Sequence, residues 1–592
     1  MIKLDKILSS SYLVFGIIFL VSFAIFGNGI SGDFVFDDNF VIDGNPLMGK
    51  FNKIPELLFS SYHFKQPETG LYRPITIISY SLNQLFFGLK SNSFHVVNIF
   101  LHILATFYLF KFLIHHLDKR FSALSAFIFL LLPIHVEAVT SIVGRAELLM
   151  ALFVILGLYF RDKGQNIKSY LFFFLALLSK ETAIAFLPII FFLDYYKKPK
   201  DIKNILLSLW PYLILITVYF IFRYAALETY FLSNDGTEIY NPIKGLSLFN
   251  GLYISIKVLF LYVFKTILPI TLSSDYSFNQ ISTEYNITNS IQFLLGFILL
   301  ILTISLIFYR KYIELRIGSF MFLAPFFIIS NLIFKTGTIM AERLMYLPSV
   351  GVSILLAFLL SKLANRKDQL RYLGFLILIF ISIFYSYKII DRNRDWLTEE
   401  KLFMSAYEAS PKSVVNMTNY AYLFAKNNDL ARAREIIDQT LKVAPEHIGS
   451  LNLAGRIYEL QGDKRKAYEF WLKTIELKPT YIRGIRDVGR LEYEFGNYQE
   501  AELTLKRAVD LYPRVNEVFL LSLTKTKLIK YKEAIDIITI NYGDNPEDNN
   551  LKFALGLVYY RMGDKSKADF YFNQSRNPDI SEDDFLRALD QI

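Results

Sequence analysis

The chain has no cysteine among its 592 residues, and only 20% of its positions are Asp, Glu, Lys or Arg. The absence of cysteine excludes disulfides, thiolate nucleophiles, cysteine-bound zinc and iron–sulfur clusters. The low charge argues against an ordinary soluble protein of this size, since 53% of the residues are hydrophobic and 16% are aromatic. The composition therefore favours a polytopic membrane protein.

The apolar runs end near Ile390, and the remainder of the chain is polar and charged. A membrane-spanning helix needs about 20 apolar residues. The first run follows Lys3 and Lys6, but it is long and lacks an A-x-A cleavage site, so we expect an anchor rather than a signal peptide. Candidate spans lie near residues 8–28, 94–115, 121–136, 146–160, 168–180, 182–196, 205–226, 249–268, 289–309, 317–335, 344–362 and 372–390.

Basic residues in the short loops set the expected orientation, because Lys and Arg stay on the cytoplasmic side. With the N-terminus in the cytoplasm, the basic loops in the first part of the chain fall on the cytoplasmic side. Later basic loops would fall on the outer side if every candidate run crossed the membrane. The run at 249–268 contains Lys257 and Lys265 and meets Pro269, so we interpret it as an interfacial or re-entrant helix. About eleven crossings remain, and the C-terminal domain is extracytoplasmic. The cytoplasmic anchors explain most of the net charge of +9, so no nucleic-acid partner is expected.

The sequence after residue 395 repeats itself. Pro411, Pro445, Pro479 and Pro513 are 34 residues apart, which is the period of the tetratricopeptide repeat, or TPR. Small residues recur between these prolines and let paired helices pack closely. We predict a TPR α-solenoid of about five repeats over residues 396–592. Its concave groove suits an extended protein or peptide, and a docking or dimerisation scaffold is the alternative.

Ionisable residues interrupt the apolar half in four places, although a charge at membrane depth costs about 2.5–3.5 kcal/mol. In the eleven-crossing topology each place falls at the outer end of a helix or in an outer loop. The four groups can therefore converge on one extracytoplasmic cavity. They are Asp37 and Asp38 in the first outer loop (29–93), then His135, Glu137, Arg145 and Glu147, then Lys180 and Glu181, and last Glu342 and Arg343.

Residue types suggest the chemistry of such a cavity. Adjacent carboxylates can supply a general base, so Asp37 and Asp38 are the candidate catalytic residues. Basic side chains suit a phosphate at the membrane surface. Together they describe sugar transfer from a lipid-linked phosphate, whose leaving charge preorganised cations stabilise. The candidate phosphate contacts are Arg145, Lys180, Arg343, His135 and Arg73, and the acids that support the site are Glu137, Glu147, Glu181 and Glu342.

Simpler interpretations stay open for each element. Asp-Asp in a loop can be a solvated turn. The charged groups can be interfacial ion pairs that satisfy each other, in the pairings Glu137 with Arg145, Lys180 with Glu181 and Glu342 with Arg343. The whole chain can then be a non-enzymatic assembly scaffold or a transporter component. No spacing of His and carboxylates makes a recognisable metal site, so no obligatory divalent cation or other cofactor is expected.

Several segments, taken in order, resemble a known family. They are FVFDDNFVIDGNP, LYRPITIISYSLN, FHVVNIFLHILAT, LPIHVEAVTSIVGRAELLMALF, LSKETAI, LSSDYSF and MAERLMYLPSVG, followed by the repeats. This arrangement resembles the transmembrane and tetratricopeptide-repeat O-mannosyltransferases of the GT-C fold. The resemblance implies an inverting transferase that uses a polyprenyl-phosphate sugar, with the first acid of the loop motif as base. That role falls on Asp37, with Asp38 as a neighbour that positions the acceptor or the loop.

We therefore expect a GT-C glycosyltransferase domain at 1–395 and a TPR domain at 396–592. The expected reaction moves a hexose, by analogy mannose, from a polyprenyl phosphate to Ser or Thr hydroxyls of a protein held by the repeats. A glycan or lipid acceptor for the same donor is the enzymatic alternative. The absence of cysteine and the excess of Lys, Ile, Asn, Phe and Tyr suggest a bacterial inner membrane, or the endoplasmic reticulum membrane for a eukaryotic source.

Overall fold

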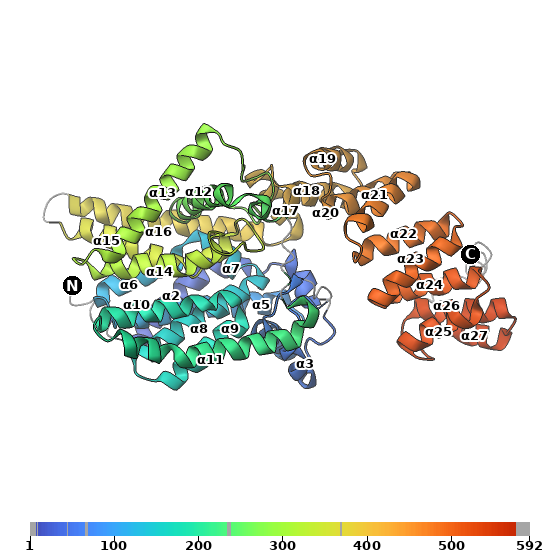
Figure 1. Cartoon of the computed structure of the whole chain (residues 1–592), viewed down its shortest axis with the longest axis horizontal. Coiled ribbons are helices and arrows are strands. Elements are labelled where there is room, and N and C mark those ends of the chain that lie inside the picture. The colour runs from blue at the N-terminus through green and yellow to red at the C-terminus, as the bar shows by residue number, and fades with distance from the viewer. Residues whose placement is uncertain are drawn as a thin grey trace. The chain divides into compact units, whose positions relative to one another are not determined.

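The computed structural model of the chain describes residue 8 and residues 10–43, 45–64, 69–231, 233, 238–366 and 370–575. Helices dominate this described part, which contains no strand, and the all-α prediction is confirmed. The chain divides into two compact units, Met1–Asn416 and Met417–Ile592 (Figure 1). Lys3, Lys6 and the C-terminal seventeen positions, 576–592, lie outside the described residues.

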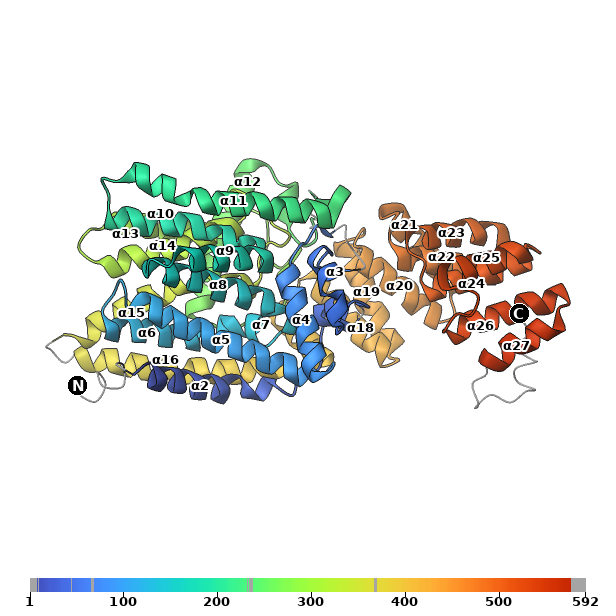
Figure 2. The ribbon, with the colours of Figure 1, turned by 90° about the horizontal axis from the view of Figure 1, so that it is seen from below.

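The first unit is a bundle in which long helices run side by side (Figure 2). Apolar residues cover nearly the whole circumference of these helices, as expected where both the core and the surroundings are apolar. Its helices are α2 (Ser11–Phe26), α3 (Ile54–Leu58), α4 (Pro74–Phe87), α5 (Ser91–Leu113), α6 (Lys119–Leu131), α7 (Val136–Val139), α8 (Arg145–Asp162), α9 (Asn166–Ser179), α10 (Phe186–Lys197), α11 (Ile202–Leu227), α12 (Leu248–Ile267), α13 (Ile287–Phe308), α14 (Ile313–Ile329), α15 (Ser349–Ala364), α16 (Leu370–Asp395) and α17 (Glu399–Ala409).

Seven helices in the described ranges are long and apolar enough to cross a membrane, or eight if the pair bent by 54° at Leu132 is one span. In the 18-residue apolar window of Ile142–Asp162, 89% of the window is buried inside the protein, whereas in the corresponding window of Ile287–Phe308 only 11% is buried. The former is thus central, and the latter presents its apolar surface outward, as a lipid-facing helix does. Leu248–Ile267 is one of the seven by its length and composition. These criteria test neither its expected interfacial placement nor the expected eleven crossings, so both stay predictions.

Breaks between helices put charged residues at helix ends. Proline starts the 3₁₀ turn Pro133–His135 after α6, because it cannot continue the helical hydrogen-bond ladder. The turn Glu181–Ala185 separates α9 from α10, and the turn Glu342–Met345 precedes α15. The charged groups of the apolar half therefore lie in the turns and at the first residues of the helices that follow them.

The first unit extends 21 residues past the expected domain boundary at 395, to Asn416. The physical reason is packing of residues 396–416 on the loop that follows α12. The side chain of Asn416 is buried, and its Nδ2 donates to the carbonyl oxygens of Ala406, Ser410 and Asp275 at 3.0–3.3 Å. Helix α17 is consequently part of the first unit rather than of the repeats.

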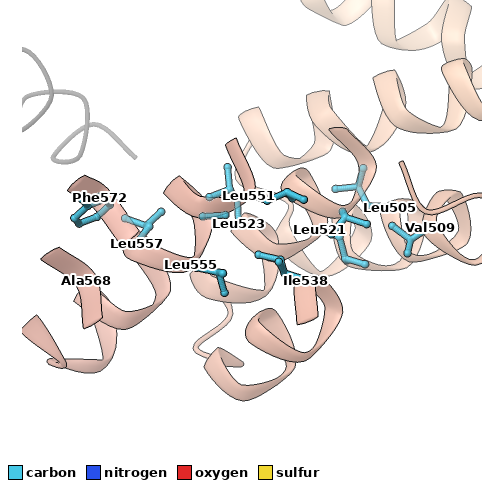
Figure 3. Packing of buried hydrophobic residues seen from close by; sticks show 12 residues of the cluster. Leu505, Val509, Leu521, Leu523, Ile538, Leu551, Leu555, Leu557, Ala568 and Phe572 are labelled. Carbon is cyan, nitrogen blue, oxygen red and sulfur yellow. The ribbon is translucent and has the colours of Figure 1, made fainter. Parts of the chain in front are cut away.

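The repeats consist of paired helices, and the first helix of each described pair begins 33 or 34 residues after the previous one. Glycines allow the close approach, since a Cβ on Gly455 would lie 2.5 Å from Trp471 Nε1. Figure 3 shows the last repeats packing around Leu505, Leu521 and Phe572. The pairs are α18 (Val414–Lys426) with α19 (Leu430–Val443), α20 (Ile448–Leu460) with α21 (Lys464–Leu477), α22 (Ile482–Glu494) with α23 (Tyr498–Leu511), α24 (Val515–Lys527) with α25 (Tyr531–Tyr542), and α26 (Asn549–Met562) with α27 (Lys565–Ser575).

Candidate active site

Three ion pairs join distant parts of the first unit. Arg343 binds Glu137, and the backbone N–H of residue 343 also donates to Glu137 Oε2 at 2.8 Å. Lys180 binds Glu147, and both side chains are buried. These contacts bring together three of the four charged groups of the sequence, because the pairs connect the turns at 133–147, 180–181 and 342–343. The remaining group is the Asp-Asp loop.

Arg73 holds the third pair. Its Nε and Nη2 donate to the two carboxylate oxygens of Glu181 at 3.1 and 2.7 Å, which is the bidentate arrangement that Arg favours. The guanidinium also lies over the ring of Tyr62, 5.2 Å from its centroid. Burial would raise the pKa of the Glu181 carboxyl, but Arg73 more than offsets it and brings the pKa to about 2. Glu181 therefore stays ionised and cannot act as a proton donor near neutral pH.

The Asp-Asp loop is linked to this cluster by the electrostatic effect of Asp37 on Arg343. Burial disfavours the charged guanidinium, but Glu137, then Asp37, then Glu147 more than offset this effect, so the pKa of Arg343 lies above its usual range. The Arg343 side chain is 32% exposed and uses one guanidinium nitrogen on Glu137. Of the basic candidates, it is the one that keeps both exposure and donors available for a phosphate.

The two carboxylates of the loop differ in environment. Asp37 is partly exposed, and its side chain accepts no hydrogen bond within the described part of the chain. Asp38 is fully buried and accepts from the backbone N–H groups of Val35 at 3.1 Å and Val143 at 2.9 Å. Burial raises the pKa of Asp38 to about 7, against the opposing effect of these bonds. Asp38 therefore ties the loop to the turn before α8, while Asp37 is available to a substrate.

An open groove of about 780 Å³ lies where the two ends of the first outer loop meet. Asp33, Phe34 and Asn39 form one wall, and Phe87 with residues 89–93 form the other. The walls mix apolar and hydrogen-bonding side chains. The groove shares its first wall with the segment that carries Asp37.

Arg145 is placed differently from the other basic candidates. Its side chain is fully buried, and its Nε, Nη1 and Nη2 donate to Asn98 Oδ1, to the carbonyl of Ser79, and to Asn83 Oδ1 and the carbonyl of Phe94, at 2.8–3.2 Å. Four of the five N–H donors of this buried guanidinium are therefore committed to neutral protein acceptors, and its position is closed to a phosphate. The geometry gives Arg145 the role of fastening α4 and α5 to the start of α8.

His135 and Glu342 also lie apart from the three ion pairs. His135 is buried among Phe129 and Tyr346, and its Nε2 is 2.7 Å from Ser349 Oγ. Glu342 Oε1 accepts from the backbone N–H of Ser273 at 2.6 Å and from the hydroxyl of Tyr276 at 2.5 Å. Neither side chain contacts a basic residue of the cluster, so both positions support the surrounding structure.

The partners expected for an ion-pair interpretation are wrong. The pairings Glu137 with Arg145, Lys180 with Glu181 and Glu342 with Arg343 do not form. The observed pairs are Arg343 with Glu137, Lys180 with Glu147 and Arg73 with Glu181. Adjacent residues such as 180 and 181 differ in side-chain direction, so each reaches a separate partner.

Sequence reasoning missed Tyr62, Ser273 and Tyr276. The LSSDYSF stretch was a visible signal, since a polar run between apolar helices needs partners, but nothing in its spacing points to Glu342. Within the described ranges, no group of three or more His, Asp and Glu is placed to hold a metal ion. The expected absence of an obligatory cation stays a prediction.

Comparison with family models finds no match. Among curated proteins, the chain is 28% identical over 430 residues to the protein O-mannosyl-transferase F38B6.6 of Caenorhabditis elegans, covering 71% of this chain and 61% of that protein. It is 25% identical over 476 residues to human TMTC3, at 72% and 51% coverage, and 26% identical over 489 residues to human TMTC1, at 71% and 54%. Both human proteins are named protein O-mannosyl-transferases.

The chain thus spans about half to three-fifths of the length of these relatives. Among solved structures, it is similar to YrrB, described as a TPR protein with an unusual peptide-binding site. The match has 18% identity and a TM-score of 0.28, and it covers 32% of this chain and 98% of YrrB. The curated relatives confirm the resemblance to the transmembrane and tetratricopeptide-repeat O-mannosyltransferases.

Proposed function

We propose that this chain is an inverting membrane glycosyltransferase that moves mannose from a polyprenyl phosphate to Ser or Thr hydroxyls of an extracytoplasmic protein. The names of its homologues support O-mannosylation of proteins. The apolar helices of the first unit support a membrane setting, which a polyprenyl donor requires. The repeats support a protein acceptor, since stacked helix pairs form extended binding surfaces.

One observation carries the proposal: the Asp37 side chain is partly exposed and accepts no hydrogen bond within the described structure, and its charge helps to raise the pKa of the Arg343 guanidinium. A general base must reach the acceptor proton, and a cation must face the leaving phosphate. Asp37 and Arg343 fit these two roles. The other two cations, Lys180 and Arg73, are held by their own carboxylates and shape the wall behind them.

In the proposed step, Asp37 takes the proton of the acceptor hydroxyl while its oxygen forms a bond to the anomeric carbon. The bond between that carbon and the phosphate oxygen breaks on the opposite face, so the configuration inverts. The polyprenyl phosphate leaves with the additional negative charge, and the Nη and Nε donors of Arg343 stabilise it. We assign the acceptor segment to the groove lined by Asp33 and Asn39, on the same stretch of chain that carries Asp37.

The test uses the full chain in lipid, with polyprenyl-phosphate mannose as donor and a Ser/Thr-rich peptide as acceptor. Asp37→Asn keeps the size of the side chain but removes the base, so we expect transfer to fall by about 10²–10⁴-fold with normal insertion. The matched control is Glu56→Gln, an exposed acid of the same outer loop, which should behave like the parent. If Asp37→Asn turned over as fast as the parent, the assignment of Asp37 as the general base would be wrong.

The same assay separates the acceptor classes. A free glycan or lipid acceptor in place of the peptide should give no product if the proposal is correct. Product with the glycan or lipid alone would keep the donor chemistry and replace the protein acceptor.

A further inference from the structure

The segment that follows α16 contacts the loop that carries Asp37. The backbone N–H of Asp33 donates to the carbonyl oxygen of Leu397 at 2.9 Å. Phe36 packs edge-on against Phe403 of α17, with ring centroids 6.1 Å apart and an interplanar angle of 89°. The loop is therefore held from a part of the chain that directly precedes the repeats.

Phe36 has an unusual backbone conformation. Its φ is +53°, in the left-handed region that bulky side chains rarely adopt. Such a conformation persists only where the surroundings hold it. Because Phe36 directly precedes Asp37, its backbone angles set the direction in which the Asp37 side chain leaves the loop. Asp38 adds a local constraint by accepting from Val35 N across Phe36.

Helix α17 has a firm anchor of its own. The carbonyl oxygen of Ala406 accepts from Asn416 Nδ2 at 3.0 Å and from Ser273 Oγ at 3.4 Å. The backbone N–H of Ser273 in turn donates to Glu342, the residue before Arg343. Helix α17, which carries Phe403, is hydrogen-bonded to the loop that contains Ser273, and this loop is hydrogen-bonded to the turn that contains Arg343. Helix α17 can therefore maintain the position of Asp37 relative to that turn.

We propose that Phe403 is a positioning residue that holds Phe36 in its left-handed conformation and so directs Asp37 toward the acceptor hydroxyl. This inference rests on the proposed transferase function. Phe403 touches no substrate in this assignment, and it acts through the backbone of residue 36. Its loss should therefore change the turnover rate rather than the binding of the donor.

The first test is Phe403→Ala in the full chain in lipid, with activity measured per folded molecule. We expect kcat to fall about 10- to 100-fold, since misplacement of a reacting group by about 1 Å has effects of this size, while the KM for the donor stays unchanged. The control is Met404→Ala on the same helix, where the side chain is 42% exposed. Equal kcat values in both variants and the parent would overturn the proposal.

The second test separates backbone direction from simple packing. Glycine adopts positive φ freely, whereas alanine does not. If the backbone direction at residue 36 determines the activity, Phe36→Gly should retain more activity than Phe36→Ala. Phe36→Gly should then also partly restore the activity of a Phe403→Ala chain. If only the packed ring matters, glycine is no better than alanine in either background because it adds flexibility, and the proposal fails.

Hydrogen exchange gives a readout that does not need activity. In Phe403→Ala, the amides of residues 33–39 should exchange faster than in the parent and in Met404→Ala. If the parent transfers no sugar, the proposed function fails, but faster exchange still supports the contact between α17 and the loop. Unchanged exchange at 33–39 would overturn the positioning role whatever the activity.

Discussion

The two units differ in how far apart along the chain their charged partners lie. In the first unit, Arg343 and Glu137 are 206 positions apart, and Arg73 and Glu181 are 108 apart. In the second unit, Lys464 and Glu494 are 30 positions apart, as neighbouring repeats require. The repeats thus pair charges between neighbouring helix pairs, whereas two ion pairs of the candidate site form only when distant parts of the bundle come together.

Burial differs in the same direction. The side chains of Lys180 and Glu147 are 6% and 3% exposed, and those of Lys464 and Glu494 are 52% and 29% exposed. A buried charge without its partner is costly, whereas an exposed pair contributes little. Ion pairs in the first unit should thus decide whether the site forms at all, and those of the second unit should mainly adjust its surface.

The largest expected effect comes from breaking one pair in each unit. Lys180→Met leaves the buried Glu147 carboxylate without its cation, so we expect a loss of about 3–5 kcal/mol in stability. Lys464→Met should cost at most about 1 kcal/mol. Thermal unfolding of the full chain in lipid measures both. Similar losses for the two variants would break the distinction between the units.

The next effect compares two arginines inside the first unit. Arg343→Lys keeps a charge but loses the fork of donors, so transfer should fall about 10- to 100-fold while the protein stays folded. Arg145→Lys cannot replace the bonds to Asn98 and Asn83, so it should lower stability, with activity per folded molecule nearly unchanged. Separate measurements of melting temperature and kcat test this. A selective loss of kcat in Arg145→Lys would return that residue to the site.

Sequence reasoning succeeded where contacts are local. The prolines from Pro411 onward have the spacing at which the helix pairs recur, because each repeat packs mainly on its neighbours. The domain boundary was less accessible. Asn416 lies where the repeat period predicts a TPR helix, but its side chain is bonded to residues around Asp275 and Ala406, and no local pattern reports such a contact.

The sequence predicts which charged residues belong to the candidate site, but not which of them form ion pairs with each other. Charges such as Lys180 and Glu147 stand out in the sequence because apolar segments rarely contain a charged residue that has neither a partner nor a function. Arg145 and Arg343 look alike in sequence, since each stands next to a break and near an acid. Only three-dimensional burial separates them, one bound by neutral acceptors and the other about one-third exposed.

A third prediction compares helix glycines of the two units. A Cβ on Gly455 would meet the Trp471 ring at 2.5 Å, so Gly455→Ala should cost about 1–3 kcal/mol by overpacking. Gly16 in α2 has nothing within 4 Å of its Cβ position, so Gly16→Ala should stabilise by up to about 1 kcal/mol through backbone entropy. Hydrogen exchange in α20 and in α2 reports each effect locally. A neutral Gly455→Ala would mean that α20 and α21 can move apart to accept the added methyl group, which would contradict the close packing expected at this position.

The smallest effect concerns pH and the buried carboxyl of Asp38. Burial raises its pKa from 3.8 to about 7, so the folded state binds the proton more tightly than the unfolded chain. The stabilisation is complete below about pH 4 and is lost as the pH rises through 7. Asp38→Asn mimics the neutral form, so the stability difference between parent and variant should shift in favour of the variant from pH 6 to pH 8, by about 1 kcal/mol. Melting temperatures across this range test it, and a constant difference would mean that Asp38 stays ionised throughout, as the bonds from Val35 and Val143 favour.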